Sequence, residues 1–246
     1  SRQSMTNHVL LNNVDHKDLK VIMTRSAEYG DNVQCALTFF WEFRSVQAHY
    51  PIFFSKNADT GAFAAVAMFG FEDKENLFLS EAGWDAHYIP LSIKREPFLI
   101  GFQQSTDAGS GDKEPVIHVD MDSPRVSESE GEAVFLAHGG ISPYLEQTNS
   151  ILNTINEGHP VHELFIKELV ELDLLEPFAI DIQLDDGSQN RLMGFHTINE
   201  DVLFELDRDV LASLNEKGFL LPIYMAVASL SNIRDLIARK NALLEP

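Results

Sequence analysis

The chain has 246 residues, 44% of them hydrophobic, and is therefore long enough to bury a substantial core as one large domain or two small ones. Asp and Glu number 38 against 18 Lys and Arg, and the formal charge of -20 argues against nucleic acid and anionic membrane surfaces as partners. The single cysteine, Cys35, excludes an intrachain disulfide and a cysteine-based zinc site.

The N-terminal residues carry no targeting pattern. Residues 1–4 precede Met5 and are expected to be a cloning remnant, and no basic start with an apolar h-region follows Met5. We expect a cytoplasmic protein, or one exported by a route that needs no signal. The longest candidate membrane span, 219–230, contains a proline and is shorter than the roughly 20 residues that a crossing needs, so a core helix is expected there. No linker forces a split, and residues 5–246 are predicted to form a single domain.

Residues 50–79 are apolar on both sides of a polar turn, which predicts neighbouring strands with a short further strand at 77–79. Within 62–71 both sets of alternate residues are apolar, a pattern typical of a strand that is covered on both faces inside a sheet. Two more strands are predicted at 97–102 and 115–121, joined by a polar, Gly-containing surface connection.

Helices are predicted from Ser142 onward, because Ser142 is a good N-cap and Pro143 suits the first helical position. A second helix is expected after residues 158–160. Its apolar stripe consists of Val161, Leu164, Phe165, Leu169 and Leu172. Two helical segments close the chain at about 200–217 and 221–243, with Gly218 placed to cap the first of them.

A hairpin is predicted over 178–198, because apolar and polar residues alternate on both sides of a favoured turn, Asp186-Gly187. This turn would place Ile180 opposite Met193. The order of strands, helices, hairpin and further helices lacks the alternation of a doubly wound fold. We therefore predict an α+β fold, with a largely antiparallel central sheet and helices concentrated in the C-terminal half.

Several motifs, in this order and spacing, resemble the SapC family of bacterial proteins from about Leu10 to Leu236. They are HKDLKV (16–21), EFRSVQAHYPIFF (42–54), GFEDKENLFL (70–79), WDAHYIP (84–90), PFLIGF (97–102), DMDSPRVSESEGEAVF (120–135), LLEP (174–177) and FHTINEDVLFEL through IYMAVASL (195–230). The resemblance implies a protein without an assigned reaction, linked through the family's namesake to the bacterial surface layer. Some members are labelled transport permeases, which the missing predicted spans argue against here.

The leading hypothesis is a soluble, non-enzymatic accessory or interaction protein without a cofactor, associated with envelope components. Its ligand surface is placed around His16, Trp84, His87 and Tyr88, because aromatic and polar side chains gather in a predicted loop and can contact a protein, peptide or glycan. A third hypothesis, a structural subunit, predicts a large apolar interface and a stable oligomer.

The alternative is an oxygenase with Fe(II) and 2-oxoglutarate as cofactors. His118 and Asp120 lie two apart on a predicted strand and project from one face. A His-x-Asp pair with a distant histidine is the facial triad of such enzymes. His196 is the best third ligand and His138 a weaker one. Because a His-x-Asp pair is common by chance in a chain with 9 His and many Asp, a surface or hydrogen-bonded strand end is the preferred interpretation of the pair.

Other candidate residues favour structural roles. His159 and His162 are expected to cap a helix or lie on the surface rather than bind zinc. Glycines at 109–111 and 139–140 lack the elements of a phosphate loop and indicate turns. Cys35 lies among apolar residues, where a thiol is usually inert.

Overall fold

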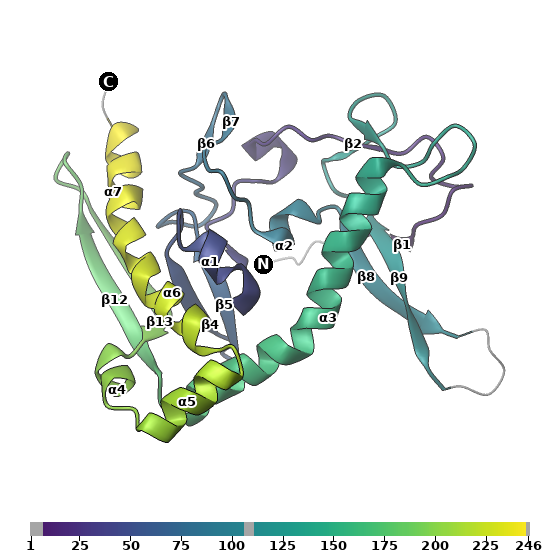
Figure 1. The fold of residues 1–246 in the computed structure, drawn as a ribbon. Helices are drawn as coiled ribbons and strands as arrows, with labels where there is room; N and C mark the ends of the chain where they lie inside the picture. The colour runs from purple at the N-terminus through teal and green to yellow at the C-terminus, as the bar shows by residue number, and fades with distance from the viewer. Residues whose placement is uncertain (1–6, 106–110, 245–246) are drawn as a thin grey trace. The chain divides into compact units, whose positions relative to one another are not determined.

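The computed structural model describes residues 7–105 and 111–244 (Figure 1). The chain divides into two compact units, each formed by two separate segments. Unit 1 comprises Ser1–Asp31 and Ile93–Gly158, and unit 2 comprises Asn32–Ser92 and His159–Pro246. Helices and antiparallel sheets make the fold α+β, with the larger helices in the second half of the chain, as predicted. The single domain over 5–246 stays a prediction, and the expected remnant at 1–4 lies outside the described residues.

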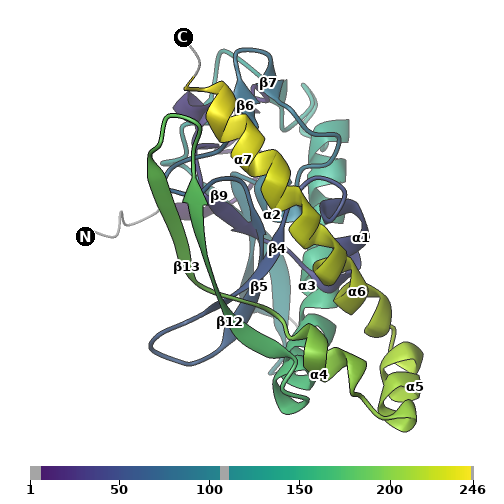
Figure 2. The ribbon, with the colours of Figure 1, turned by 90° about the vertical axis from the view of Figure 1, so that its left-hand side faces the viewer.

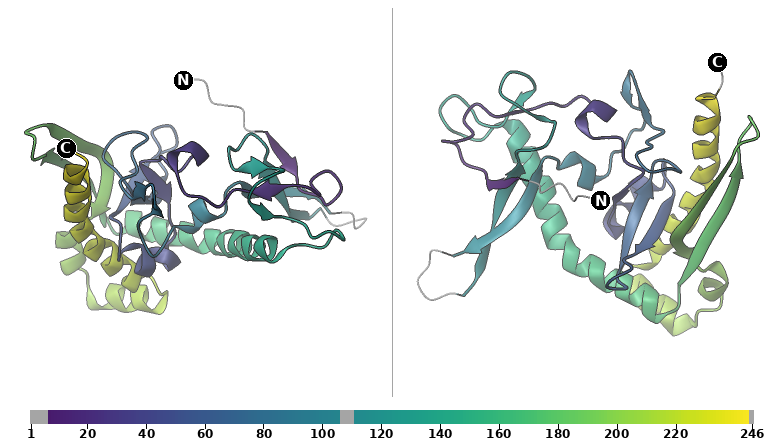
Figure 3. Two further views of the ribbon diagram at one scale, coloured as in Figure 1. Left: turned by 90° about the horizontal axis from the view of Figure 1, so that it is seen from above. Right: turned by 180° about the vertical axis from the view of Figure 1, so that it is seen from behind.

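Unit 1 contains an antiparallel sheet in the order β1-β9-β8, and its strands β8 and β9 form a long two-stranded ribbon in the right-hand view of Figure 3. The strands are β1 (His8–Leu10), β8 (Phe98–Gln104) and β9 (Lys113–Asp120). The strands predicted at 97–102 and 115–121 are confirmed. The connection between them includes 106–110, which lie outside the described residues, as does part of the glycine motif at 109–111.

A smaller sheet in unit 1 has the order β10-β2-β11 and short strands. They are β2 (Lys20–Val21), β10 (Val126–Ser127) and β11 (Glu132–Ala133). The core of the unit joins both sheets to the following helix through Leu19, Val21, Phe98, Val119, Val134, Leu145 and Leu152. Burial of these side chains, at roughly 25 cal/mol per Å² of apolar surface, is the main favourable term for this unit.

The helix α3 (Pro143–Glu171) begins as predicted, because the N–H of Leu145 donates to Ser142 Oγ at 3.1 Å. It continues through Pro160, so the prediction of two separate helices was wrong. Pro160 is exposed, which lets water reach the carbonyl group that it leaves without a donor. Buried side chains before and after it, Leu152 and Phe165, hold the helical turns on each side.

Unit 2 is built on an antiparallel sheet in the order β12-β13-β4-β5-β3. Its strands are β3 (Cys35–Leu37), β4 (Ile52–Lys56), β5 (Phe63–Met68), β12 (Leu175–Gln183) and β13 (Gln189–Ile198). Successive residues of β4, Phe53 and Phe54, are both 0% exposed, so both faces of the sheet are covered, as the apolar pattern predicts. The strand expected at 77–79 is wrong, because only Leu79 of that stretch enters a strand, β6 (Leu79–Ser80), which pairs with β7 (Gly83–Trp84).

The predicted hairpin forms, but with a different turn. Leu184 N–H donates to the carbonyl of Ser188 at 2.9 Å, and Gly187 has φ +84°, which makes residues 185–187 the loop. The register therefore shifts by one residue, and Ile180 pairs with Leu192. Its predicted partner, Met193, is 62% exposed. A bulge beside Gly194, at φ +87°, restores the alignment closer to the strand ends.

The remaining helical elements are short. They are η1 (Ala27–Tyr29), η2 (Phe40–Glu42), α1 (Phe43–Val46), α2 (Leu91–Lys94), α4 (Glu200–Phe204), α5 (Arg208–Glu216), α6 (Leu220–Ser229), η3 (Leu230–Asn232) and α7 (Ile233–Ala242). Gly218, at φ +74°, ends α5 as predicted, because its N–H donates to Asn215 and that of Phe219 to Leu214. The predicted stripe after Pro160 is partly wrong: Val161 and Leu164 are exposed.

The stretch Leu220–Ala242, which joins α6, η3 and α7, has the length and composition of a helix that could cross a membrane. Length and composition alone are weak evidence of a membrane span, because core helices of soluble proteins can have the same length and composition. Figure 2 shows α6 and α7 following one another in one long helical stretch, and α6 contacts both β4 and β13. Its residues Ile223 and Ala226 are buried in unit 2, whereas Leu221 and Tyr224 are exposed, so α6 packs on the unit by one face only.

Gly131 tests how tightly the small sheet of unit 1 is packed. A Cβ atom at this position would lie 2.2 Å from the Val21 carbonyl oxygen, and φ is +102°. At Gly187 the φ is also positive, but a Cβ atom would meet nothing within 4 Å. We expect Gly187→Ala to lower the free energy of unfolding by about 1–2 kcal/mol, and Gly131→Ala to lower it by about 2 kcal/mol more, because backbone must move. Urea unfolding of both variants measures this, and equal losses would contradict it.

Candidate ligand pocket

Asn12 organises the loop that carries His16. Its backbone N–H donates to His16 Nδ1 at 3.1 Å, and its Oδ1 accepts the N–H groups of Val14 at 3.0 Å and Asp15 at 2.8 Å. Its Nδ2 donates to Asp15 Oδ2 at 2.9 Å. Because Nδ1 of a neutral imidazole that accepts a hydrogen bond carries no proton, the proton lies on Nε2. The local chain therefore fixes the orientation of both side chains and the tautomer of the ring.

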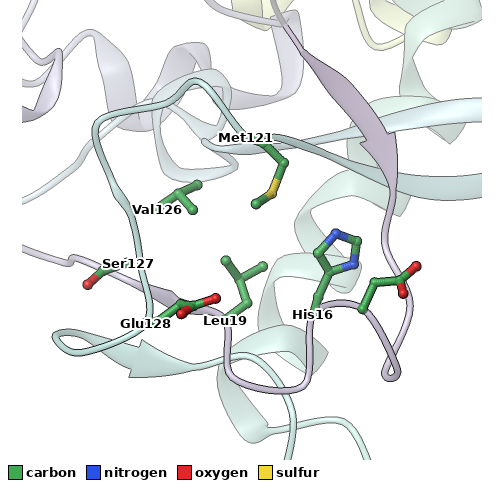
Figure 4. A pocket seen from close by; sticks show the side chains of 7 residues that line it. His16, Leu19, Met121, Val126, Ser127 and Glu128 are labelled. Atoms are coloured by element: carbon green, nitrogen blue, oxygen red, sulfur yellow. The ribbon is translucent and has the colours of Figure 1, made fainter.

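His16 lines a pocket of about 330 Å³ in unit 1. Its other lining residues are Asp15, Leu19, Met121, Val126, Ser127 and Glu128. Figure 4 shows the imidazole and the Met121 thioether facing the same space, with Leu19 below and Val126 opposite. His16 is 8% exposed and its Nε2 has no hydrogen-bond partner among the described residues. A volume near the lower end of ligand pockets suits one small group.

The wall of the pocket is held by the buried side chain of Arg125, which is 2% exposed. Its Nη1 donates to the carbonyls of Ile22 at 2.8 Å and Thr24 at 2.9 Å, and its Nη2 forms an ion pair with Asp31. Asp31 also accepts from Arg25 Nη1 at 3.2 Å. Because Arg125 directly precedes the pocket residues 126–128, this network fixes their backbone.

The side chain of Ser127 stabilises the turn of its own loop. Its Oγ accepts the N–H groups of Ser129 at 3.2 Å and Glu130 at 3.1 Å, and Lys20 Nζ reaches the Ser129 carbonyl at 3.4 Å. A serine nucleophile needs a neighbouring base to take its proton. The hydrogen bonds of Ser127 are those of a turn instead, so we assign it to the wall of the pocket.

Glu96, also in unit 1, is a half-buried carboxyl group in the field of the same arginines. Burial raises its pKa above the ordinary value, and the charges of Arg95 and Arg125 lower it to a smaller extent. It does not line the pocket.

The predicted site residues of unit 2 join a buried hydrogen-bond network. Trp84 Nε1 donates to the hydroxyl of Tyr50 at 2.9 Å, which donates in turn to the carbonyl of Tyr88. Tyr88 donates to Glu42 Oε1 at 2.6 Å. Burial raises the pKa of both tyrosine hydroxyls, so they stay protonated donors. Glu42 is 3% exposed and also accepts from Thr38, Phe39 and Leu91.

His87 is exposed, and its ring lies 5.9 Å from that of His49. Trp84, His87 and Tyr88 belong to unit 2, whereas His16 belongs to unit 1, so neither unit brings all four predicted residues together. The hydrogen bonds of Trp84 and Tyr88 give them an anchoring role in their own loop. Their part in ligand binding stays a prediction.

The residues of the iron hypothesis are also divided between the units. His118 and Asp120 lie on β9 in unit 1, and the His118 ring fills the space over Gly101, where an added Cβ would meet Nε2 at 2.5 Å. His196 lies on β13 in unit 2, with its ring 4.8 Å from Phe63. Among residues 7–105 and 111–244, no group of three or more His, Cys, Asp or Glu side chains could hold a metal ion. His138 is exposed. The triad therefore remains a prediction without support from either unit.

His162 corrects the expectation of a surface or capping histidine. It is 7% exposed, and its Nδ1 accepts the N–H of Phe40 at 3.1 Å. Burial, with a smaller contribution from His159, lowers its pKa to about 4. His159 is the exposed one of the pair and lies 3.8 Å from Glu163. Burial likewise raises the pKa of Cys35, in keeping with an inert thiol.

Comparison with known proteins places the chain in a family. The SapC family model matches residues 11–236 of the 246-residue chain. The chain belongs to the SapC family. The matched region contains every residue that lines the pocket. No curated protein matches the chain, and no solved structure does. SapC membership by itself assigns neither a reaction nor a ligand.

The sequence identified only His16 among the pocket residues. Asp15, Met121 and Glu128 were missed, although a signal for them existed. His16 opens one SapC-like motif, at 16–21, and Met121 and Glu128 lie in another, at 120–135. Pairing of β2 with β10 brings these two motifs together, and that pairing is not visible in the sequence.

Because Arg125 and Asp31 form a buried ion pair, we expect a single substitution at Asp31 to lower the free energy of unfolding strongly. In Asp31→Asn the guanidinium would remain buried without its main counter-charge, and we expect the free energy of unfolding to fall by about 3–5 kcal/mol. Asp181→Asn is the control, because Asp181 pairs with Arg191 at 3.4 Å on the surface, where an ion pair contributes about 1 kcal/mol or less. Urea unfolding compares them, and similar small losses would refute a central role for Asp31.

His162 predicts a loss of stability in acid. Its pKa is 6.5 in the unfolded chain and about 4 in the folded protein, so between these values the unfolded chain binds the additional proton. The free energy of unfolding should therefore fall as pH decreases through this window, by on the order of 3 kcal/mol. His162→Asn keeps an acceptor for Phe40 and should lack this component of the slope. Urea unfolding at a series of pH values tests it; parallel curves for both proteins would contradict it.

Proposed function

We propose that this SapC protein is a non-enzymatic accessory protein that binds a component of the bacterial envelope through the pocket around His16. The proposal rests on one observation, a difference in hydrogen bonding between polar groups of unit 1. Arg125 Nη1 and Nη2 bond to the chain and to Asp31, and Arg125 does not line the pocket, whereas His16 Nε2 has no partner among the described residues and faces it. A donor in this state can gain a new hydrogen bond from a ligand.

The lining of the pocket favours binding over catalysis. Its hydroxyl group, on Ser127, already accepts two backbone N–H groups. Leu19, Met121 and Val126 supply apolar surface, which small-molecule sites use together with a few placed polar groups. The envelope link comes from the family's namesake, and the encounter would take place in the cytoplasm or after export by a signal-free route.

His16→Asn is the sharpest test of this function. The Asn carbonyl can replace Nδ1 as the acceptor for Asn12, while the pocket loses the Nε2 donor and most of the ring. We expect fragments from digested peptidoglycan or surface polysaccharide to bind the wild-type protein, detected by saturation-transfer NMR, and binding to His16→Asn to be lost.

His138→Asn provides the matched control, because His138 is an exposed histidine of the same unit that does not line the pocket. It should bind like the wild type. Equal binding by both variants would place the ligand elsewhere, and no binding of any fragment would refute the proposed function.

A further inference from the structure

The pocket offers an unequal set of hydrogen-bonding groups. On the acceptor side, Asp15 Oδ1 and both oxygens of Glu128 have no hydrogen-bond partner among the described residues, and both side chains are exposed at the rim. On the donor side stands Nε2–H of His16, and the Ser127 hydroxyl lies 3.4 Å from Ser129 Oγ of its own loop. The lining contains no lysine or arginine. A complementary ligand therefore brings several donors, preferably with positive charge, and one neutral acceptor.

We propose that the pocket binds a primary ammonium group next to a neutral oxygen acceptor on a short apolar body, with Asp15 and Glu128 contacting the ammonium and His16 Nε2–H the oxygen. This deepens the proposed function and rests on it. The combination occurs at the N-terminus of a peptide and in an amino sugar, two sources that share this chemistry. Leu19, Met121 and Val126 provide the contact for the apolar body.

The buried imidazole distinguishes this pocket from an ordinary acidic patch on an acidic protein. His16 is 8% exposed, and its Nε2 faces the pocket without a hydrogen-bond partner among the described residues. Its second nitrogen is held in the acceptor state by Asn12, so Nε2 must donate and cannot accept from an ammonium. The acceptor oxygen on the ligand follows from this tautomer, and a bare amine would leave the donor unmatched.

Long-range charge favours the same class of ligand. The formal charge of -20 raises the concentration of cations at the surface and lowers that of anions. A metal cation is disfavoured, because the pocket residues are not among any group of three His, Cys, Asp or Glu in the described chain that could hold one. An organic ammonium needs no such closed shell of ligands.

The test uses small probes and isothermal titration calorimetry at low salt on the full chain. Leucinamide has the ammonium, the carbonyl and an apolar body, N-acetylleucinamide lacks the charge, and glucosamine with N-acetylglucosamine forms the corresponding sugar pair. We expect binding of the charged member of at least one pair, no binding of the acetylated members, and weaker binding at high salt.

Matched variants locate the ammonium. Asp15→Asn keeps an oxygen for Asn12 Nδ2 and should weaken binding about tenfold or more, as should Glu128→Gln. The controls are Asp18→Asn and Glu130→Gln, which make the same charge changes on exposed acids of the same loops that do not line the pocket. Their affinity should equal that of the wild type, and circular dichroism confirms that all four variants are folded.

A second pair of variants tests the ring. His16→Gln can place an N–H donor near the position of Nε2, whereas the shorter side chain of His16→Asn can replace the acceptor for Asn12 but cannot place its N–H donors that far into the pocket. We expect His16→Gln to bind leucinamide more tightly than His16→Asn does, and the reverse order would overturn the proposal.

The outcomes separate the two proposals. Binding of leucinamide alone indicates a peptide source, binding of glucosamine alone an amino sugar, and each supports the ammonium site. Equal affinity for charged and acetylated probes, or competition by Mg²⁺ at the same residues, overturns it. If envelope fragments bind through His16 but neither charged probe does, this inference fails and the proposed function stands. If the fragments do not bind either, both fail.

Discussion

The ion pair between Arg125 and Asp31 is the interaction on which unit 1 depends. A guanidinium that is 2% exposed would be unfavourable without a counter-charge and full hydrogen bonding. Arg125 obtains the counter-charge and most of these hydrogen bonds from one short segment, through Asp31 and the carbonyls of Ile22 and Thr24, and its Nε has no partner among the described residues. It thereby joins that segment to the residues that line the pocket, while β2 pairs with β10 and β11 on either side. The shape of the pocket follows from a satisfied buried charge rather than from regular secondary structure.

Unit 2 also contains a buried side chain with several hydrogen-bond partners, in this case the carboxyl group of Glu42. Glu42 is 3% exposed and accepts hydrogen bonds from Tyr88 and Leu91 as well as from its own turn, so it ties the loop after β7 to η2. Aromatic and polar side chains such as Trp84 and Tyr88 look the same in a sequence whether they bind a ligand or anchor a loop. Only their hydrogen-bond partners distinguish the two roles, and here those partners lie within the unit.

Features that depend on neighbouring residues could be predicted from the sequence. The Ser142 cap, the Gly218 cap and the strands on either side of 57–62 follow from local chemistry, and they are present. Features that depend on distant partners could not. The hairpin register next to the turn was misplaced because one extra loop residue shifts every pair between the turn and the bulge, and α3 continues through Pro160 because Leu152 before it and Phe165 after it are buried. Arg125 and Asp31 are 94 residues apart, and nothing local marks them as partners.

Whether a polar group already has a hydrogen-bond partner also distinguishes a structural role from a role in ligand binding. A polar group that is already bonded gains little from a ligand, because one hydrogen bond merely replaces another. Arg125 Nη1, Glu42 and Ser127 are in that state. His16 differs because Asn12 occupies one ring nitrogen and leaves the other facing the pocket, beside carboxylates that hold the rim negative. The pocket therefore holds groups that can gain hydrogen bonds from a ligand, in a site whose shape the buried network has already fixed, so little ordering opposes the ligand.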